Sequence, residues 1–308
     1  MIFLAPLGVN CKFQLEKFLA DGTITYRGPE FSNVVLENGL GMMASYAPNS
    51  VSYAGISWCN LGRSSRIEHF ADTGLDEFIT STNNQPEDIV TDYATGAGYP
   101  YPMWRSWRHV FEFPIGSIND TVSEIGLSRL QNSDYFNRHR IVDEHSLSVR
   151  IPVLSFEGLR VWARTSIHST VDSTERASGS FELETLDGPV TIPYEWRQLE
   201  GWLTSANIVP GRVVASDIRL SQVQTSNYNA GTPASSIAVT YDPLDGYYKT
   251  IEATWDIDTL NGDYNCLLFQ NTGASFSRFD LFEPIQMEAL GWRLKLTLVR
   301  TWGRYHAA

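Results

Sequence analysis

A stretch near the middle of the chain alternates between apolar and polar residues as a half-buried β-strand does. From residue 107 to residue 115, every second side chain belongs to Trp107, His109, Phe111, Phe113 or Ile115. Side chains on a strand point alternately to its two faces, so this spacing predicts a strand with one face against a core. Pro114 has no backbone N–H to donate, so we expect the strand to end there or to lie at a sheet edge.

The same alternation recurs along most of the chain. It predicts further strands at residues 51–61, 147–154, 159–168, 180–185, 190–194, 212–220, 237–241, 248–257 and 292–302. Many short alternating strands separated by turn residues, with no strand–helix–strand rhythm, are typical of antiparallel sandwiches and barrels. We therefore expect a mainly β fold, an antiparallel β-sandwich or barrel-like core with a few short helices and an N-terminal arm.

The arm is predicted to span residues 1–30, and the β-sandwich core residues 31–308. A short helix at residues 11–20, stopped by Asp21 and Gly22, is expected within the arm, which would dock on its own domain or on a neighbour. Further helical turns are expected near Leu40, at residues 73–80 and at residues 194–204. The polar run at residues 171–179 is the best internal boundary of the core.

Composition excludes several classes of function. The net charge of −12 gives the chain no general attraction for nucleic-acid backbones. No stretch approaches the roughly 18 apolar residues of a membrane-spanning helix, and the N-terminus has no basic region of a signal peptide. We therefore expect a soluble protein made in the cytoplasm. The three distant cysteines, Cys11, Cys59 and Cys266, fit neither a disulfide framework nor a zinc motif, so we expect them to be reduced and buried.

No residue pattern indicates catalysis or a cofactor. There is no G-x-S-x-G motif, and the spacing of His139 and His145 does not fit one helix face. Residues 256–263 resemble a calcium loop but have one residue too many before the Asn-Gly pair. Acidic neighbours occur at Glu182 and Glu184 and around Asp72, as expected by chance in a chain with 35 acids. We predict a protein that is not an enzyme and has no cofactor or metal.

Interface contacts are the expected role of several aromatic and arginine residues. Only four of the 23 cationic residues are lysines, and interfaces favour arginine and aromatic residues over lysine. Lineage bias in codon usage is the alternative explanation of the low number of lysines. The strand at 159–168 turns an Arg-Trp-Arg face away from the core, and the loop around residues 93–101 is rich in tyrosine. The candidate interface residues are Arg160, Trp162, Arg164, Tyr93, Tyr99, Tyr101, Phe13 and Phe18.

Several short motifs, in order along the chain, resemble segments of tailed-bacteriophage virion proteins. They are Leu36–Leu40 (LENGL), Trp58–Gly62 (WCNLG), Asp72–Leu75 (DTGL), Trp107–Gly116, Ser123–Leu127 (SEIGL), Phe136–Arg138 (FNR) with Ile141 and Val142, Phe282–Ile285 (FEPI), Leu296–Leu298 and Thr301–Arg304 (TWGR). The matches run from about residue 31 to residue 304. The chain departs from the family at residues 60–64, where the family more often has a turn of small residues.

The resemblance implies a structural component of the neck, collar, tail or tail-fibre attachment, located in the virion. Its expected partners are other virion proteins and copies of itself, and it implies no catalytic residues. An alternative from another class is a host-surface glycan-binding module or depolymerase of the tail. That alternative depends on the tyrosine-rich loop and on an exposed Trp162, and its partner would be a host-surface glycan.

Overall fold

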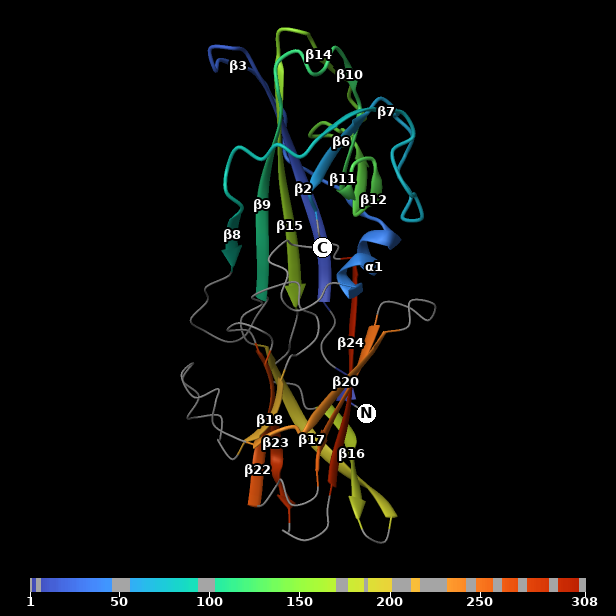
Figure 1. The fold of residues 1–308 in the computed structure, drawn as a ribbon, viewed down its shortest axis with the longest axis vertical. Helices are drawn as coiled ribbons and strands as arrows, with labels where there is room; N and C mark the ends of the chain where they lie inside the picture. Colours follow the sequence, from blue (N-terminus) through green and yellow to red (C-terminus); the bar gives the residue numbers. More distant parts are fainter. Residues whose placement is uncertain are drawn as a thin grey trace.

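The computed structural model describes residues 2–3, 7–45, 56–93, 103–169, 177–185, 188–200, 212–216, 232–241, 248–256, 262–270, 276–287 and 293–304. The molecule is elongated, and most strands run along its long axis (Figure 1). It is mainly β, with antiparallel sheets that do not close into a barrel, so the predicted β-sandwich-like fold class is confirmed. The described ranges contain one helix, α1 (Glu37–Ser45), and none with the length and apolar character of a membrane-crossing helix.

The first sheet of the sandwich is built on three long antiparallel strands. β15 (Gly158–Ser169) lies between β2 (Leu7–Phe18) and β9 (Met103–Phe113), and β8 (Val90–Tyr93) flanks β9. Alternate side chains of the three long strands enter the core, as the period-two pattern predicts for β9 and β15. Phe111 and Phe113 are fully buried there, which stabilises the fold by roughly 1.5–3 kcal/mol each.

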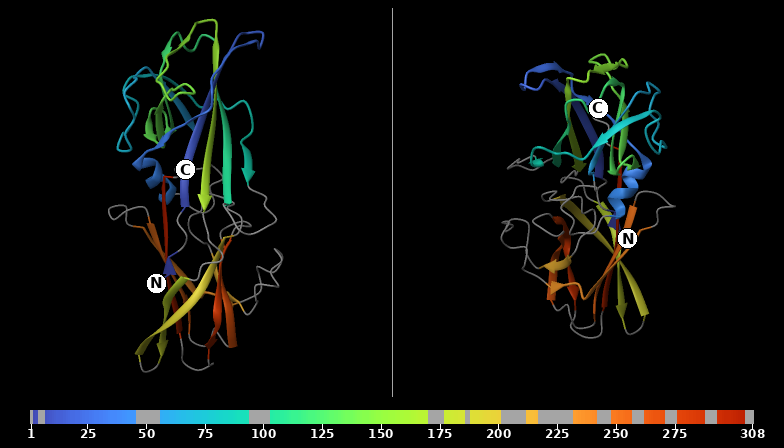
Figure 2. Two further views of the ribbon diagram at one scale, coloured as in Figure 1. Left: turned by 180° about the vertical axis from the view of Figure 1, so that it is seen from behind. Right: turned by 45° about the horizontal axis from the view of Figure 1, so that its top comes forward.

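A second, smaller sheet covers the inner face of the first. Its order is β5 (Val34–Val35), β13 (Asn137–Arg140), β11 (Glu124–Leu130), β6 (Trp58–Gly62) and β7 (Phe78–Thr82), with β12 (Ser133–Tyr135) paired to β11. Leu61 of β6 and Ile125 of β11 belong to one hydrophobic cluster with Phe13 of β2 and Val161 of β15. This shared cluster makes the two sheets a sandwich. Figure 2 shows the two layers from other directions.

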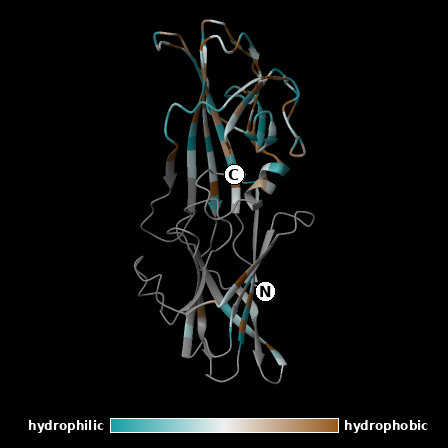
Figure 3. Cartoon of the chain, in the orientation of Figure 1, coloured by the Kyte–Doolittle hydropathy of each residue, from teal (hydrophilic) through white to brown (hydrophobic). Residues whose placement is uncertain are grey.

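Short strands complete this half of the molecule. β3 (Ile24–Arg27) and β4 (Phe31–Ser32) pair with β2, and β10 (Asp120–Val122) pairs with β14 (Ile151–Val153). Hydrophobic and hydrophilic segments alternate along the strands of this half in Figure 3.

The remaining strands form the other half of the molecule and join the first sheet through β24 (Arg293–Arg304). β24 runs parallel to β2 and to β1 (Ile2–Phe3), and antiparallel to β16 (Ala177–Thr185) and β21 (Tyr248–Trp255). The other strands are β17 (Gly188–Glu200), β18 (Arg212–Ser216), β19 (Thr232–Pro233), β20 (Ser236–Tyr241), β22 (Gly262–Gln270) and β23 (Phe276–Met287). The first and last strands of the chain therefore lie side by side.

Three helical expectations are wrong. Residues 11–18 belong to β2, and residues 194–200 belong to β17. Residues 73–77 are bends that lead into β7. In β2, Cys11, Phe13 and Leu15 are buried, and pairing with β15 across twelve residues fixes this period-two pattern over any local helical preference. The expected boundary at 171–179 lies largely outside the described residues. The expectation that the three cysteines are buried and form no disulfide is confirmed.

Candidate functional site

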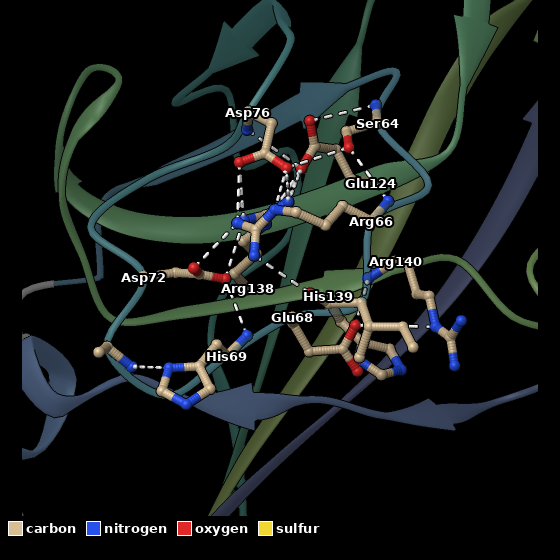
Figure 4. Close-up of polar contacts among 12 residues, drawn as sticks. Ser64, Arg66, Glu68, His69, Asp72, Asp76, Glu124, Arg138, His139 and Arg140 are labelled. Carbon is tan, nitrogen blue, oxygen red and sulfur yellow. Dashed lines mark hydrogen bonds and ion pairs between the residues drawn. The ribbon is translucent and has the colours of Figure 1, made fainter.

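The strongest concentration of charge in the described structure is an ion cluster around the buried side chains of Arg138 and Glu124. We define the Arg138 cluster as Arg66, Asp72, Asp76, Glu124 and Arg138 (Figure 4). The Arg138 side chain, on β13, is 1% exposed. Its Nη1 donates to Asp72 Oδ2 at 2.8 Å, its Nη2 to Asp76 Oδ2 at 2.7 Å, and its Nε to Glu124 Oε2 at 3.1 Å. One guanidinium therefore joins three carboxylates from two separate segments of the chain.

Arg66 contacts the same two aspartates from the solvent side. Its Nε lies 2.6 Å from Asp76 Oδ2, and its Nη2 lies 2.9 Å from Asp72 Oδ1. The hydrogen bond from Arg66, and then that from Arg138, holds the pKa of Asp76 well below its ordinary value of 3.8. The hydrogen bonds to Asp76 and then to Asp72 raise the pKa of Arg66. Asp76 is therefore held as a carboxylate by two guanidiniums.

Glu124, on β11, fastens the loop of residues 63–77 to the second sheet. Its Oε1 accepts the backbone N–H groups of Glu77 at 3.0 Å and of Ser64 at 3.3 Å, in addition to the ion pair with Arg138. The side chain packs on Gly62, where an added Cβ would lie 2.4 Å from Glu124 Oε1. Glycine at position 62 is therefore a requirement of this close approach.

A second polar contact holds the same loop further along. His139 Nδ1 lies 2.6 Å from Glu68, and the His139 ring stacks on Phe31 with centroids 5.6 Å apart. Arg140 also approaches Glu68, at 3.8 Å. Loop 63–77 is thus tied to β13 at Arg138 and again at His139 and Arg140.

Four of the motifs that carry the family resemblance meet at this cluster. Asp72 belongs to DTGL, Glu124 to SEIGL, Arg138 to FNR and Gly62 to WCNLG. The LENGL motif lies alongside, because an added Cβ at Gly39 would lie 2.0 Å from the backbone oxygen of Phe136.

The terminal TWGR motif also reaches this region. Arg304 Nε donates to the backbone oxygen of Val35 at 2.6 Å, and its guanidinium lies 5.1 Å from the ring centroid of Phe70. Segments separated by up to about 270 residues in the sequence therefore converge on one small sheet.

The Arg138 cluster has a structural role: it holds loop 63–77 on the second sheet. Asp72 and Asp76 both bind the guanidinium of Arg138. They therefore do not face each other across a sugar-sized cleft, as glycoside hydrolysis needs. His139 and His145 pair with different carboxylates, Glu68 and Glu144. Within the described ranges, no group of three or more His, Cys, Asp and Glu side chains is placed to hold a metal ion. Residues 257–261 of the calcium-like segment lie outside these ranges, as do the side chains of Glu182 and Glu184.

The second candidate site is the outer face of the first sheet, where the Arg-Trp-Arg residues lie. Arg160 is directly opposite Glu16 on β2 and Glu112 on β9, and its guanidinium reaches both, at 3.6 Å and 2.8 Å. Trp162 is half-buried, and the guanidinium of Arg108 lies 5.2 Å from its ring centroid. Arg164 is 45% exposed at its side chain. The three residues share one outward face, as the alternation predicts.

Next to this face is an open groove of about 470 Å³. It lies beside Gln14, the cross-strand neighbour of Trp162 on β2. The lining residues are Gln14, Arg27, Gly28, Pro29, Asp143, Glu144 and His145.

The other candidate interface residues are placed differently. Phe13 is fully buried and Phe18 is 7% exposed, so both contribute to the chain's own core. Tyr93 ends β8, where its backbone pairs with Arg105, and its side chain is outside the described part of the structure. Tyr99 and Tyr101 lie outside the described residues.

Sequence reasoning missed the Arg138 cluster as a unit. Asp72, Glu124 and Arg138 each lie within one of the resembling motifs, but no spacing along the sequence links them. The signal that could have found them is the concentration of charged residues inside otherwise apolar motifs. Comparison with protein-family models, curated proteins and solved structures gave no match.

Proposed function

We propose that this chain is a non-enzymatic structural component of a tailed-phage virion, of the neck, collar, tail or fibre-attachment type. It acts through contacts with copies of itself and with other virion proteins, without membrane insertion or general nucleic-acid binding. It is made in the host cytoplasm and resides in the particle.

The convergence of the resembling motifs is the observation that carries this proposal. Four of these motifs, all between residues 58 and 138, contribute to the ion cluster around Arg138, and the LENGL and TWGR motifs lie beside it. Chance matches to a family pattern have no reason to meet in space, whereas motifs that build one structural unit do. Buried charges are costly unless every member is paired, so such a unit suits a rigid scaffold.

The shape of the molecule supports an assembly role. Two β halves lie along one axis and are joined by β24, which pairs with strands of both (Figure 1). Long strands give a stiff body with large side surfaces, as a component of a ring or fibre needs.

Two measurements test the proposal. Native mass spectrometry of the purified chain should show a homo-oligomer. Electron microscopy of intact particles, with the chain labelled by antibody, should locate it on the neck or tail. A chain that stays monomeric and is missing from mature particles would contradict the proposal.

The outer face supports a second candidate, a host-surface glycan-binding or depolymerase module of the tail. The open groove of about 470 Å³ is lined mostly by polar residue types and lies beside the cross-strand partner of half-buried Trp162. Aromatic rings and planar polar groups are suited to sugars. Binding of host polysaccharide that is lost in Trp162→Ala, or release of reducing ends from it, would favour this candidate, and the absence of both would remove it.

A further inference from the structure

Three cations lie side by side on the outer face of the first sheet. Arg164 on β15 is directly opposite Lys12 on β2 and directly opposite Arg108 on β9. We call Lys12, Arg164 and Arg108 the cationic row. Like charges directly opposite each other on neighbouring strands destabilise a sheet. This arrangement therefore has a cost in the isolated chain.

Acidic side chains of the same chain offset the positive charge of this row only in part. Glu30 approaches Lys12 at 3.2 Å and Arg164 at 3.7 Å. Within the described residues, Arg108 has no carboxylate partner, and its guanidinium lies over Trp162 instead. The row thus holds three cations and one acid.

The row that contains Arg160 is different. There the order across the sheet is Glu16, Arg160, Glu112, with both acids bonded to the arginine. Arg27 adds a second cation to Glu16. This row is satisfied within the chain, so Arg160 is a structural residue, whereas Arg164 is exposed and can reach a partner.

We propose that the cationic row binds carboxylates of a second copy of this chain. The inference deepens the proposed function and rests on it, because it assumes a homo-oligomer. Each copy carries a net charge of −12, so two copies repel unless a cationic surface of one meets acids of the other. Lys12 and Arg164 are exposed enough to reach outward, at 42% and 45% of their side chains.

The contact joins unlike surfaces, because a cationic row cannot face itself. Such a heterologous contact closes into a ring when the rotation between copies allows it. Arginine forms paired hydrogen bonds to carboxylates, and the half-buried Trp162 beside the row supplies an apolar surface that strengthens the contact.

The test is charge reversal followed by native mass spectrometry and light scattering at low salt. Arg164→Glu and Arg108→Glu should each raise the dissociation constant of the oligomer at least about tenfold. Arg150→Glu is the matched control, because Arg150 is an exposed arginine elsewhere on the chain, and it should leave the constant within about twofold. Circular dichroism of each variant would check that it is folded. Added salt should weaken the wild-type oligomer.

Cross-linking gives an independent readout, because only Lys12, Lys17, Lys249 and Lys295 carry side-chain amines. A zero-length carbodiimide reagent, applied to a mixture of ¹⁴N- and ¹⁵N-labelled chains, should join Lys12 to an Asp or Glu of the other copy. Mass spectrometry would then show a mixed-isotope peptide pair.

The outcomes distinguish failure of the proposed function from failure of the inference about the cationic row. A wild-type chain that is monomeric at all concentrations overturns both the homo-oligomer of the proposed function and this inference. An oligomer that is unaffected by both reversals, with Lys12 linked only to Glu30 of its own chain, overturns the inference and leaves the proposed function standing. Loss of binding to an anionic polysaccharide in Arg164→Glu, with the oligomer intact, also overturns it in favour of a glycan partner.

Discussion

Glu124 and Arg138 form an ion pair in which each side chain is 1% exposed, with Oε2 and Nη2 2.9 Å apart. The pair joins β11 to β13, and through Asp72 and Asp76 it holds loop 63–77 against the second sheet. A buried pair of this kind is sensitive to the loss of either partner, since the remaining charge stays out of water.

Arg138→Ala should lower the free energy of unfolding by about 3–5 kcal/mol, because it leaves Glu124 buried without a cation. Arg63→Ala is the control. Arg63 is 53% exposed and its carboxylate partners lie 3.6 Å away, so its loss should cost less than about 1 kcal/mol. Urea unfolding followed by tryptophan fluorescence measures both. Equal losses in the two variants would contradict the structural importance of the buried pair.

Gly62→Ala should destabilise the protein by roughly 1–3 kcal/mol, because the new methyl group overlaps the Glu124 carboxylate. Gly303→Ala serves for comparison. Gly303 also lies in a strand, but nothing lies within 4 Å of its added Cβ. Thermal unfolding of the two variants should give a lower midpoint for the first alone. If the Gly62 variant melts with the wild type, the close approach of Gly62 and Glu124 is wrong.

Part of the free energy of unfolding depends on the ionised Asp76 side chain and is lost at low pH. Its pKa is depressed in the folded state, chiefly by the hydrogen bond from Arg66, so its contribution is present above the unfolded value of 3.8 and is lost as the pH falls below that value. Asp76→Asn should therefore be less stable than the wild type at pH 7, and the gap should narrow below about pH 4. Melting temperatures across pH 2–7 test this. Asp88→Asn, at an exposed site, should track the wild type throughout, and a gap that widened in acid would contradict the sign.

His109 should add a second acid-sensitive step at higher pH. Burial lowers its pKa from 6.5 to about 4, so the folded state resists its protonation. The stability that depends on neutral His109 is present above pH 6.5 and is lost as the pH falls toward 4, by on the order of 3 kcal/mol. His109→Gln should flatten this decline in urea unfolding at pH 7 and pH 4. His145→Gln, on an exposed turn, should retain the wild-type decline, and a parallel decline in both variants would exclude His109 as its source.

Arg160 and Arg164 should behave differently although they lie four residues apart on one face of β15. Arg160→Ala removes a partner from Glu16 and Glu112 and should lower the free energy of unfolding by roughly 1–3 kcal/mol. Arg164→Ala should cost less than about 1 kcal/mol, because Arg164 is 45% exposed and its neighbour Glu30 also pairs with Lys12. Chemical unfolding of the two variants at the same protein concentration decides this, and the reverse order would contradict the assignment of Arg160 to the fold.

The sequence by itself determined which face of several strands is buried. Trp107, Phe111 and Phe113 follow one another at intervals that only a strand can place on one side, and all three are buried. Ile115 belongs to the same pattern but is 39% exposed, because the strand ends before Pro114. Binary alternation is a local property, so it can be read without knowing the partner strand.

Tertiary structure decided everything that depends on which strands are neighbours. Residues 11–18 have a sequence compatible with a short helix, and only pairing with β15 makes them a central strand. Lys12, Arg164 and Arg108 become a row only through the register of three strands that are far apart in the chain. Asp72, Glu124 and Arg138 likewise meet only after folding. Ion pairs and interfaces depend on distances of a few ångströms between remote segments, and those distances are set by packing and register rather than by spacing along the sequence.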